Sequence, residues 1–280
     1  MKLTAVRLAA TLLAAASPAA ADETCRFTGR TSYDGTLAIG AHTTIVAGAL
    51  QIDVRLQLDA NPLPLVHTHY VMQEVSAWSP QGVLWIAVND RYRFDGHIVR
   101  QQWDVYRRVG DTLQGYRLQG KRLPEFERRH PGFVQHWNPA RFGDDWLADY
   151  AKGAPDRRPD LDLTHDLAEV RVPLALSFYW LRLLPPGATT VSVFLPGFKE
   201  EKRAELAIGP SVPVSRGGTV RQAPIHYPYL SPTTPSTATV QLTPDHHIRQ
   251  LMFDLHGVEH SARGVVAQTG CTGTPLPPEG

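Results

Sequence analysis

The residues best suited to chemistry are His67 and His69, which flank Thr68 and are followed by Glu74. On a β-strand, residues two positions apart face the same side, so both imidazoles project together. Two imidazoles and a nearby carboxylate form a ligand set for a divalent transition metal. We therefore keep a metal site at His67, His69 and Glu74 as one hypothesis. The alternative, which we favour, is a set of polar residues on the open face of a strand.

This spacing resembles the first metal-binding motif of the cupins, in which two histidines one residue apart and a nearby Glu hold the metal. The resemblance implies a cupin-like enzyme that depends on a divalent metal. A cupin also takes a further His from a downstream strand with its own Gly-Pro-Gly turn, and this sequence has no such arrangement. The nearby donors are His97, His130 and His136. We keep the enzyme as an alternative function and favour a protein without a cofactor.

Other catalytic signatures are weak. Residues 256–260 read His-Gly-Val-Glu-His, the order of the inverted zinc peptidases, but that chemistry needs a helix. The alternating Leu251, Phe253 and Leu255 predict a strand instead, and Gly257 interrupts any helix. The sequence contains no G-x-S-x-G elbow of the serine hydrolases. We therefore favour a non-enzymatic protein.

A segment rich in aromatic and arginine residues covers residues 122–155 and lacks a strong period. Long irregular segments in compact domains are commonly lids or binding loops. Two tyrosines in the proline-rich residues 225–235 are placed to join it at a ligand mouth. The predicted ligand-binding residues are Phe133, Trp137, Arg141, Trp146, Tyr227 and Tyr229. An ordinary loop packed by its own aromatics, or a surface that docks a protein partner, fits the same composition.

The ends of the chain indicate export. Lys2 and Arg7 precede an apolar run that ends in three alanines before Asp22, which predicts a cleaved signal peptide over residues 1–21. We expect no transmembrane segment in the mature chain and a periplasmic location. Cys25 and Cys271 are the only cysteines, and an oxidising compartment favours their pairing as a disulfide.

The elements that would position these residues are mostly strands. Residues 50–58 alternate apolar and polar side chains, which is typical of a strand with one buried face. Similar short runs are separated by Gly, Pro, Asp or Asn and lie at residues 83–88, 98–109, 112–118, 189–198, 203–208, 237–242, 247–255 and 264–268. A short helix is expected to begin at Asn138-Pro139 and include Trp146 and Tyr150. The pattern predicts a mainly β fold, a curved antiparallel sheet, half-barrel or barrel-like, with one or two short helices.

The chain resembles uncharacterised bacterial periplasmic β-barrel proteins known as domains of unknown function. Two groups of residues carry the resemblance, the first over 32–42 with Tyr70, Glu74 and Trp78, and the second over 181–187 with the strands that follow. The resemblance implies a curved sheet of the lipoprotein-carrier kind and no established chemistry. We expect two related halves, at residues 22–155 and 156–280.

The charge balance narrows the partners. With 28 basic and 27 acidic residues, the formal net charge is +1, which gives no reason to expect nucleic acid. Our leading hypothesis is a secreted, non-enzymatic binder or carrier of an apolar or amphipathic small molecule. The alternatives are the cupin-like enzyme and an accessory subunit that docks onto a periplasmic protein complex.

Overall fold

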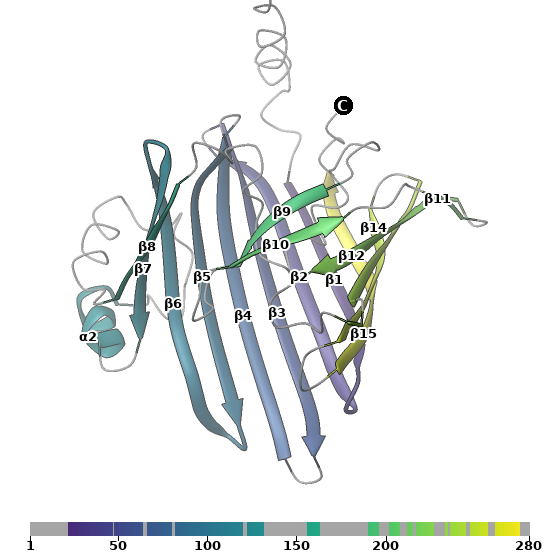
Figure 1. Ribbon diagram of the computed structural model, residues 1–280, viewed down its shortest axis with the longest axis horizontal. Coiled ribbons are helices and arrows are strands. Elements are labelled where there is room, and N and C mark those ends of the chain that lie inside the picture. The colour runs from purple at the N-terminus through teal and green to yellow at the C-terminus, as the bar shows by residue number, and fades with distance from the viewer. Residues whose placement is uncertain are drawn as a thin grey trace, which may run out of the picture.

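The chain folds into one antiparallel sheet of fifteen strands, as the computed structural model shows (Figure 1). The structure describes residues 22–46, 48–63, 66–79, 82–119, 122–131, 156–162, 190–195, 202–207, 212–214, 217–226, 233–234, 236–244, 247–256 and 261–274. The prediction of a mainly β, curved antiparallel sheet is confirmed. Strands at residues 22–31, 35–46, 66–79, 156–162 and 219–226 were not predicted from their period.

The elements follow one another with few interruptions. The strands of the first half are β1 (Asp22–Thr31), β2 (Gly35–Val46), β3 (Ala49–Leu63), β4 (Val66–Ser79), β5 (Gly82–Phe94), β6 (His97–Val109) and β7 (Thr112–Gln119). Helix α2 (Arg122–Arg129) follows. The later strands are β8 (Asp156–Asp162), β9 (Thr190–Leu195), β10 (Lys202–Ala207), β11 (Val212–Pro213), β12 (Thr219–His226), β13 (Ser236–Leu242), β14 (Ile248–His256) and β15 (Ser261–Thr274).

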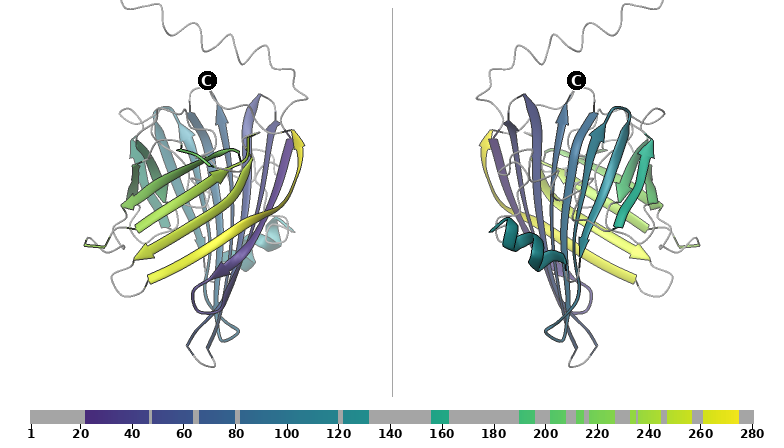
Figure 2. Two further views of the ribbon diagram at one scale, coloured as in Figure 1. Left: turned by 90° about the vertical axis from the view of Figure 1, so that its right-hand side faces the viewer. Right: turned by 90° about the vertical axis from the view of Figure 1, so that its left-hand side faces the viewer.

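The strand order is that of a barrel opened at one place. Along the sheet the order is β8-β7-β6-β5-β4-β3-β2-β1-β15-β14-β13-β12-β10-β9, with β11 paired to β12. The first and last strands therefore lie side by side within the sheet. Its two edges, β8 and β9, are consecutive along the chain, and in the described residues they do not pair. Figure 2 shows the sheet curled around an interior, in keeping with the half-barrel that the sequence predicted.

Local sequence explains the regular hairpins. The turn between β5 and β6 is Asp95-Gly96, and both residues have positive φ, 47° and 77°. This pair is favoured in tight hairpin turns, because such turns require left-handed backbone that glycine adopts freely and Asp tolerates. The tight turn fixes the register of β5 against β6, which places the side chains of the candidate site described below.

One face of the sheet is the inner, concave face. Strand β13 alternates buried and half-buried residues along its whole length, as expected for a strand with one covered face. The inner face carries most of the apolar core, including Phe27, Ile52, Val54, Ile86 and Val240. Residues 102–106 of β6 are buried on both faces.

Helix α2 lies on the outer face of the sheet, beside β7 (Figure 2). The sequence gave no helical period here, so this helix is a correction. Glu125 in its first turn and Arg128 and Arg129 in its last turn complement the helix dipole. Its Phe126 is fully buried and contacts the His130 ring.

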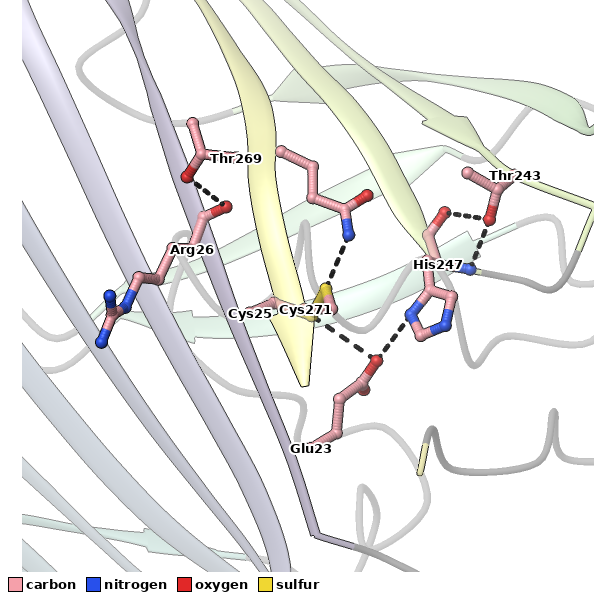
Figure 3. Close-up of a disulfide and its surroundings, with 8 residues drawn as sticks. Glu23, Cys25, Arg26, Thr243, His247, Thr269 and Cys271 are labelled. Carbon is pink, nitrogen blue, oxygen red and sulfur yellow. Dashed lines mark hydrogen bonds and ion pairs between the residues drawn. A yellow bond between two sulfur atoms is a disulfide. The ribbon is translucent and has the colours of Figure 1, made fainter. Parts of the chain in front are cut away.

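The seam between β1 and β15 is closed covalently, which confirms the predicted disulfide. Cys25 and Cys271 are directly opposite in the ladder, and their sulfurs are bonded (Figure 3). Gly29 lets the two strands approach closely, because a Cβ at this position would lie 1.8 Å from the Val265 carbonyl oxygen. The disulfide is the pairing expected of an oxidising compartment.

Some expectations fall on residues that the structure does not describe. The signal peptide, the short helix after Asn138 and the apolar run at 173–184 lie outside the described residues. The division into two halves stays a prediction. A search of the described helices finds none with the length and apolar character needed to cross a bilayer.

Candidate functional site

A group of polar side chains lies on the inner face of β4–β7, where apolar side chains would be expected. Alternation along each strand selects this face: Glu74 is opposite Val54 and Val88, and Val88 is opposite Asp104. The group comprises Tyr70, Glu74, Asp90, Arg100, Gln102, Asp104 and Arg117. Burying so many charged and polar groups is costly unless they are paired. The pairing within the group therefore decides what it can do.

The strongest pair joins Asp104 on β6 to Arg117 on β7, which are directly opposite in the ladder. Arg117 donates from Nε to Oδ1 at 2.6 Å and from Nη2 to Oδ2 at 2.9 Å. Both side chains are buried, and a two-point contact of this kind is among the strong protein hydrogen bonds. Burial lowers the pKa of Arg117, but the bonded and negatively charged Asp104 outweighs it, so the pKa is raised. The pair stays ionised.

Gln102 connects this pair to a second acid. Its amide nitrogen donates to Asp90 Oδ2 at 3.1 Å and approaches Asp104 Oδ2 at 3.3 Å. Arg100 Nε donates to the other Asp90 oxygen at 3.0 Å. Burial raises the pKa of Asp90 to about 6, a rise that the neighbouring Asp104 charge reinforces and the Arg100 charge opposes. We call Asp90, Arg100, Gln102, Asp104 and Arg117 the inner network.

Tyr70 borders the inner network from β4. Burial raises the pKa of its phenol, and the nearby Asp90 charge raises it further, while Arg100 acts against both. Its hydroxyl therefore remains protonated at any physiological pH. Tyr70 can donate and accept hydrogen bonds at this position, whereas it cannot act as a phenolate.

Glu74 is the member of the group without a hydrogen-bond partner. Its side chain is fully buried, and neither carboxylate oxygen has a hydrogen-bond partner among the described residues. Burial raises the pKa of this carboxyl well above its usual value. Such a group is rare in folded proteins because it loses its hydration without compensation. Its position beside the satisfied inner network makes it the principal candidate for contact with a ligand.

The structure places the predicted metal ligands on two different faces. His67 and His69 share the outer face of β4, whereas Glu74 is on the inner face, and the pairing of β4 with β3 is regular between His69 and Glu74. Both histidines approach Asp59 instead: His69 Nδ1 lies 2.5 Å and His67 Nε2 3.7 Å from its Oδ1. Burial raises the pKa of Asp59, but the hydrogen bond with His69 and the charges of both histidines lower it on balance. The three predicted ligands are not brought together.

The six predicted ligand-binding residues, Phe133, Trp137, Arg141, Trp146, Tyr227 and Tyr229, lie outside the described residues. Sequence reasoning missed the inner network. A signal was present, because Ile86, Val88 and Asp90 occupy alternate positions and put an acid on an apolar face. Asp104 is likewise two residues from Tyr106 on β6. Without the pairing of β5, β6 and β7, these acids read as ordinary surface charges.

Comparison with known proteins identifies a fold and no family. No protein-family model matches the chain, and no curated protein matches it. The crystal structure of a β-barrel-like protein of the domain of unknown function DUF1849, from Brucella abortus, aligns with a TM-score of 0.53 and 10% identity. The alignment covers 92% of this chain and 99% of that chain.

The β domain of the Bordetella autotransporter Brka also aligns, over 89% of this chain and 98% of that chain, at 8% identity. Its TM-score of 0.24 is too low to support any argument about fold. The likeness to the Brucella protein does bear on fold, and it agrees with the resemblance found in the sequence. This chain has the β-barrel-like architecture of an uncharacterised bacterial domain of unknown function.

Proposed function

We propose that this protein is an exported, non-enzymatic binding protein or carrier that holds an amphipathic small molecule against the inner face of its sheet. The observation that carries the proposal is the buried carboxylate of Glu74, which has no hydrogen-bond partner among the described residues. A group of this kind costs the free protein stability, and a bound donor would offset that cost. Binding sites commonly join an apolar wall to a few such polar groups.

The chemistry around Glu74 defines the polar end of the ligand. The inner network already satisfies its own carboxylates through Arg100, Gln102 and Arg117. Glu74 therefore remains as the acceptor for a ligand, and the matching head is a hydrogen-bond donor such as a primary amine or a hydroxyl group. An amine would also lower the pKa of Glu74 by favouring its charged form.

The rest of the inner face suits an apolar body. Val54 and Val88 are the cross-strand neighbours of Glu74, and Ile52 and Ile86 extend the same surface. All four are buried and apolar. Burial of apolar ligand surface against such a wall contributes about 25 cal/mol per Å². The predicted aromatic residues, Trp137 foremost, would complete the mouth of this site.

Native mass spectrometry tests the proposal. The protein is exported to a bacterial periplasm, purified without chelator and compared with its denatured mass. An organic mass that is present in the native spectrum and lost on denaturation is expected. The retained fraction should fall at least tenfold in Glu74→Met, because that side chain cannot accept a hydrogen bond.

Asp53→Asn is the matched control, since Asp53 is an acid on the outer face of neighbouring β3, hydrogen-bonded to Gln73. It should retain the ligand. A bare native mass for the wild-type protein, or equal retention in Glu74→Met and Asp53→Asn, would contradict a ligand at Glu74. A bare chain that co-purifies with an envelope protein would support the accessory-subunit alternative instead.

A further inference from the structure

A second cluster of chemically active side chains surrounds the disulfide at the seam, away from the inner network (Figure 3). Glu23 and Cys25 come from β1, Cys271 from β15, and His247 from the turn that precedes β14. One ligand atom from each of the four residues lies within 4.8 Å of the others. Glu23 and Cys25 are buried, and His247 and Cys271 are partly buried.

The contacts inside this cluster are unusual for a structural disulfide. His247 Nδ1 lies 2.7 Å from Glu23 Oε1, and the same carboxylate oxygen is 3.5 Å from Cys25 Sγ. A disulfide sulfur carries no proton, so it gives a carboxylate no hydrogen bond. On the other side, Gln268 Nε2 donates to Cys271 Sγ at 2.8 Å. An amide donor of this kind stabilises a thiolate far more than a neutral disulfide sulfur.

We infer that the reduced seam is a zinc site, with Cys25, Cys271, His247 and Glu23 as its four ligands. Two thiolates, one imidazole and one carboxylate are a donor set that suits tetrahedral Zn²⁺, whose bonds to these atoms are about 2.0–2.3 Å. Ligand atoms on such an ion are about 3.3–3.8 Å apart, which is within the spacing that the cluster already has. Gln268 would hold the Cys271 thiolate from outside the ligand set, as second-shell groups commonly do.

The reduction step requires an external dithiol. Two electrons from the dithiol break the bond between the two sulfurs, the dithiol becomes a disulfide, and Cys25 and Cys271 each take one proton. Zinc then displaces these two protons and binds the thiolates. The site is therefore closed to metal while the disulfide is intact and opens when the seam is reduced. This inference is independent of the proposed small-molecule ligand.

Metal uptake before and after reduction tests the inference. The purified protein is reduced anaerobically with a phosphine, exposed to Zn²⁺, passed through a desalting column and analysed for metal. Reduced protein should retain one Zn²⁺ per chain, and oxidised protein should retain none. With Co²⁺ in place of Zn²⁺, the reduced protein should show the thiolate-to-cobalt absorption and the intense visible bands of a tetrahedral site.

Variants identify the ligands. His247→Ala should weaken zinc binding to the reduced chain at least tenfold, and Cys25→Ser with Cys271→Ser should abolish the cobalt–thiolate band. His42→Ala is the matched control, because His42 belongs to the same end of the sheet but pairs with Asp22. It should bind zinc as the wild type does.

Three results would overturn the inference. One is equal zinc uptake by oxidised and reduced protein, since the metal would then lie elsewhere, for instance at His67 and His69. Another is equal affinity in His247→Ala and His42→Ala. The third covers a reduced chain that unfolds: zinc should restore its β-sheet circular dichroism, and failure to do so would show that no folded site forms.

Discussion

Two buried acids on the same inner face should respond to substitution with opposite signs. Glu74 has no hydrogen-bond partner among the described residues, whereas Asp104 accepts two hydrogen bonds from Arg117. Replacing Glu74 with Met keeps the length of the side chain and removes the unsatisfied carboxyl. Since an unsatisfied buried polar group costs about 1–3 kcal/mol, Glu74→Met should raise the free energy of unfolding by about that amount.

Asp104→Asn should do the reverse. It removes the charge that compensates Arg117 and replaces one acceptor with a donor that faces the guanidinium. Breaking a buried ion pair by changing one partner costs about 3–5 kcal/mol. The two variants should therefore differ by about 4–8 kcal/mol, well beyond the error of a denaturation experiment.

Urea denaturation of ligand-free, refolded protein at neutral pH measures both effects, with tryptophan fluorescence as the signal. The gain in Glu74→Met should also grow as the pH rises, because the raised pKa of Glu74 means that its ionised form is the destabilising one. A Glu74→Met variant less stable than wild type by more than about 1 kcal/mol would refute the reasoning, since the carboxyl would then make favourable contacts.

Three further predictions follow from the described contacts. Because burial raises the pKa of Asp90 from 3.8 to about 6, its contribution to stability is fully present below pH 3.8 and is lost as the pH rises through 6. The loss is about 3 kcal/mol at about 1.4 kcal/mol per pKa unit, and the pH slope measured by urea denaturation should flatten in Asp90→Asn. Replacing Cys25 and Cys271 together with Ser should lower stability, by up to about 5 kcal/mol if the unfolded chain gains the full entropy of the opened loop, with a midpoint unchanged from wild type as the contrary result. Gly29→Ala should cost about 1–3 kcal/mol, because its Cβ would overlap the Val265 carbonyl; thermal denaturation checks this, and Gly40→Ala, which meets nothing within 4 Å, is the control.

The sequence by itself determined the class of fold and the covalent closure of the chain. Alternation at residues 50–58, and at most of the shorter runs, is a direct record of strands with one buried face, because side chains project to opposite sides with a period of two. Cys25 and Cys271 had only each other as partners. Helix α2 was missed because tertiary contact, through buried Phe126, outweighs its weak local pattern.

Tertiary structure decided the candidate site. Asp104 and Arg117 meet because the register of β6 on β7 places them opposite each other, and register depends on turns and pairing that no single run of sequence reveals. The separation of Glu74 from His67 and His69 is odd, which puts them on opposite faces only if β4 runs without a bulge, as the structure shows it does. The approach of His247 to Glu23 likewise arises from the pairing of the last strands with the first, across more than two hundred residues of chain. Local pattern fixes which residues can be buried together, and the long-range pairing of strands fixes which of them meet.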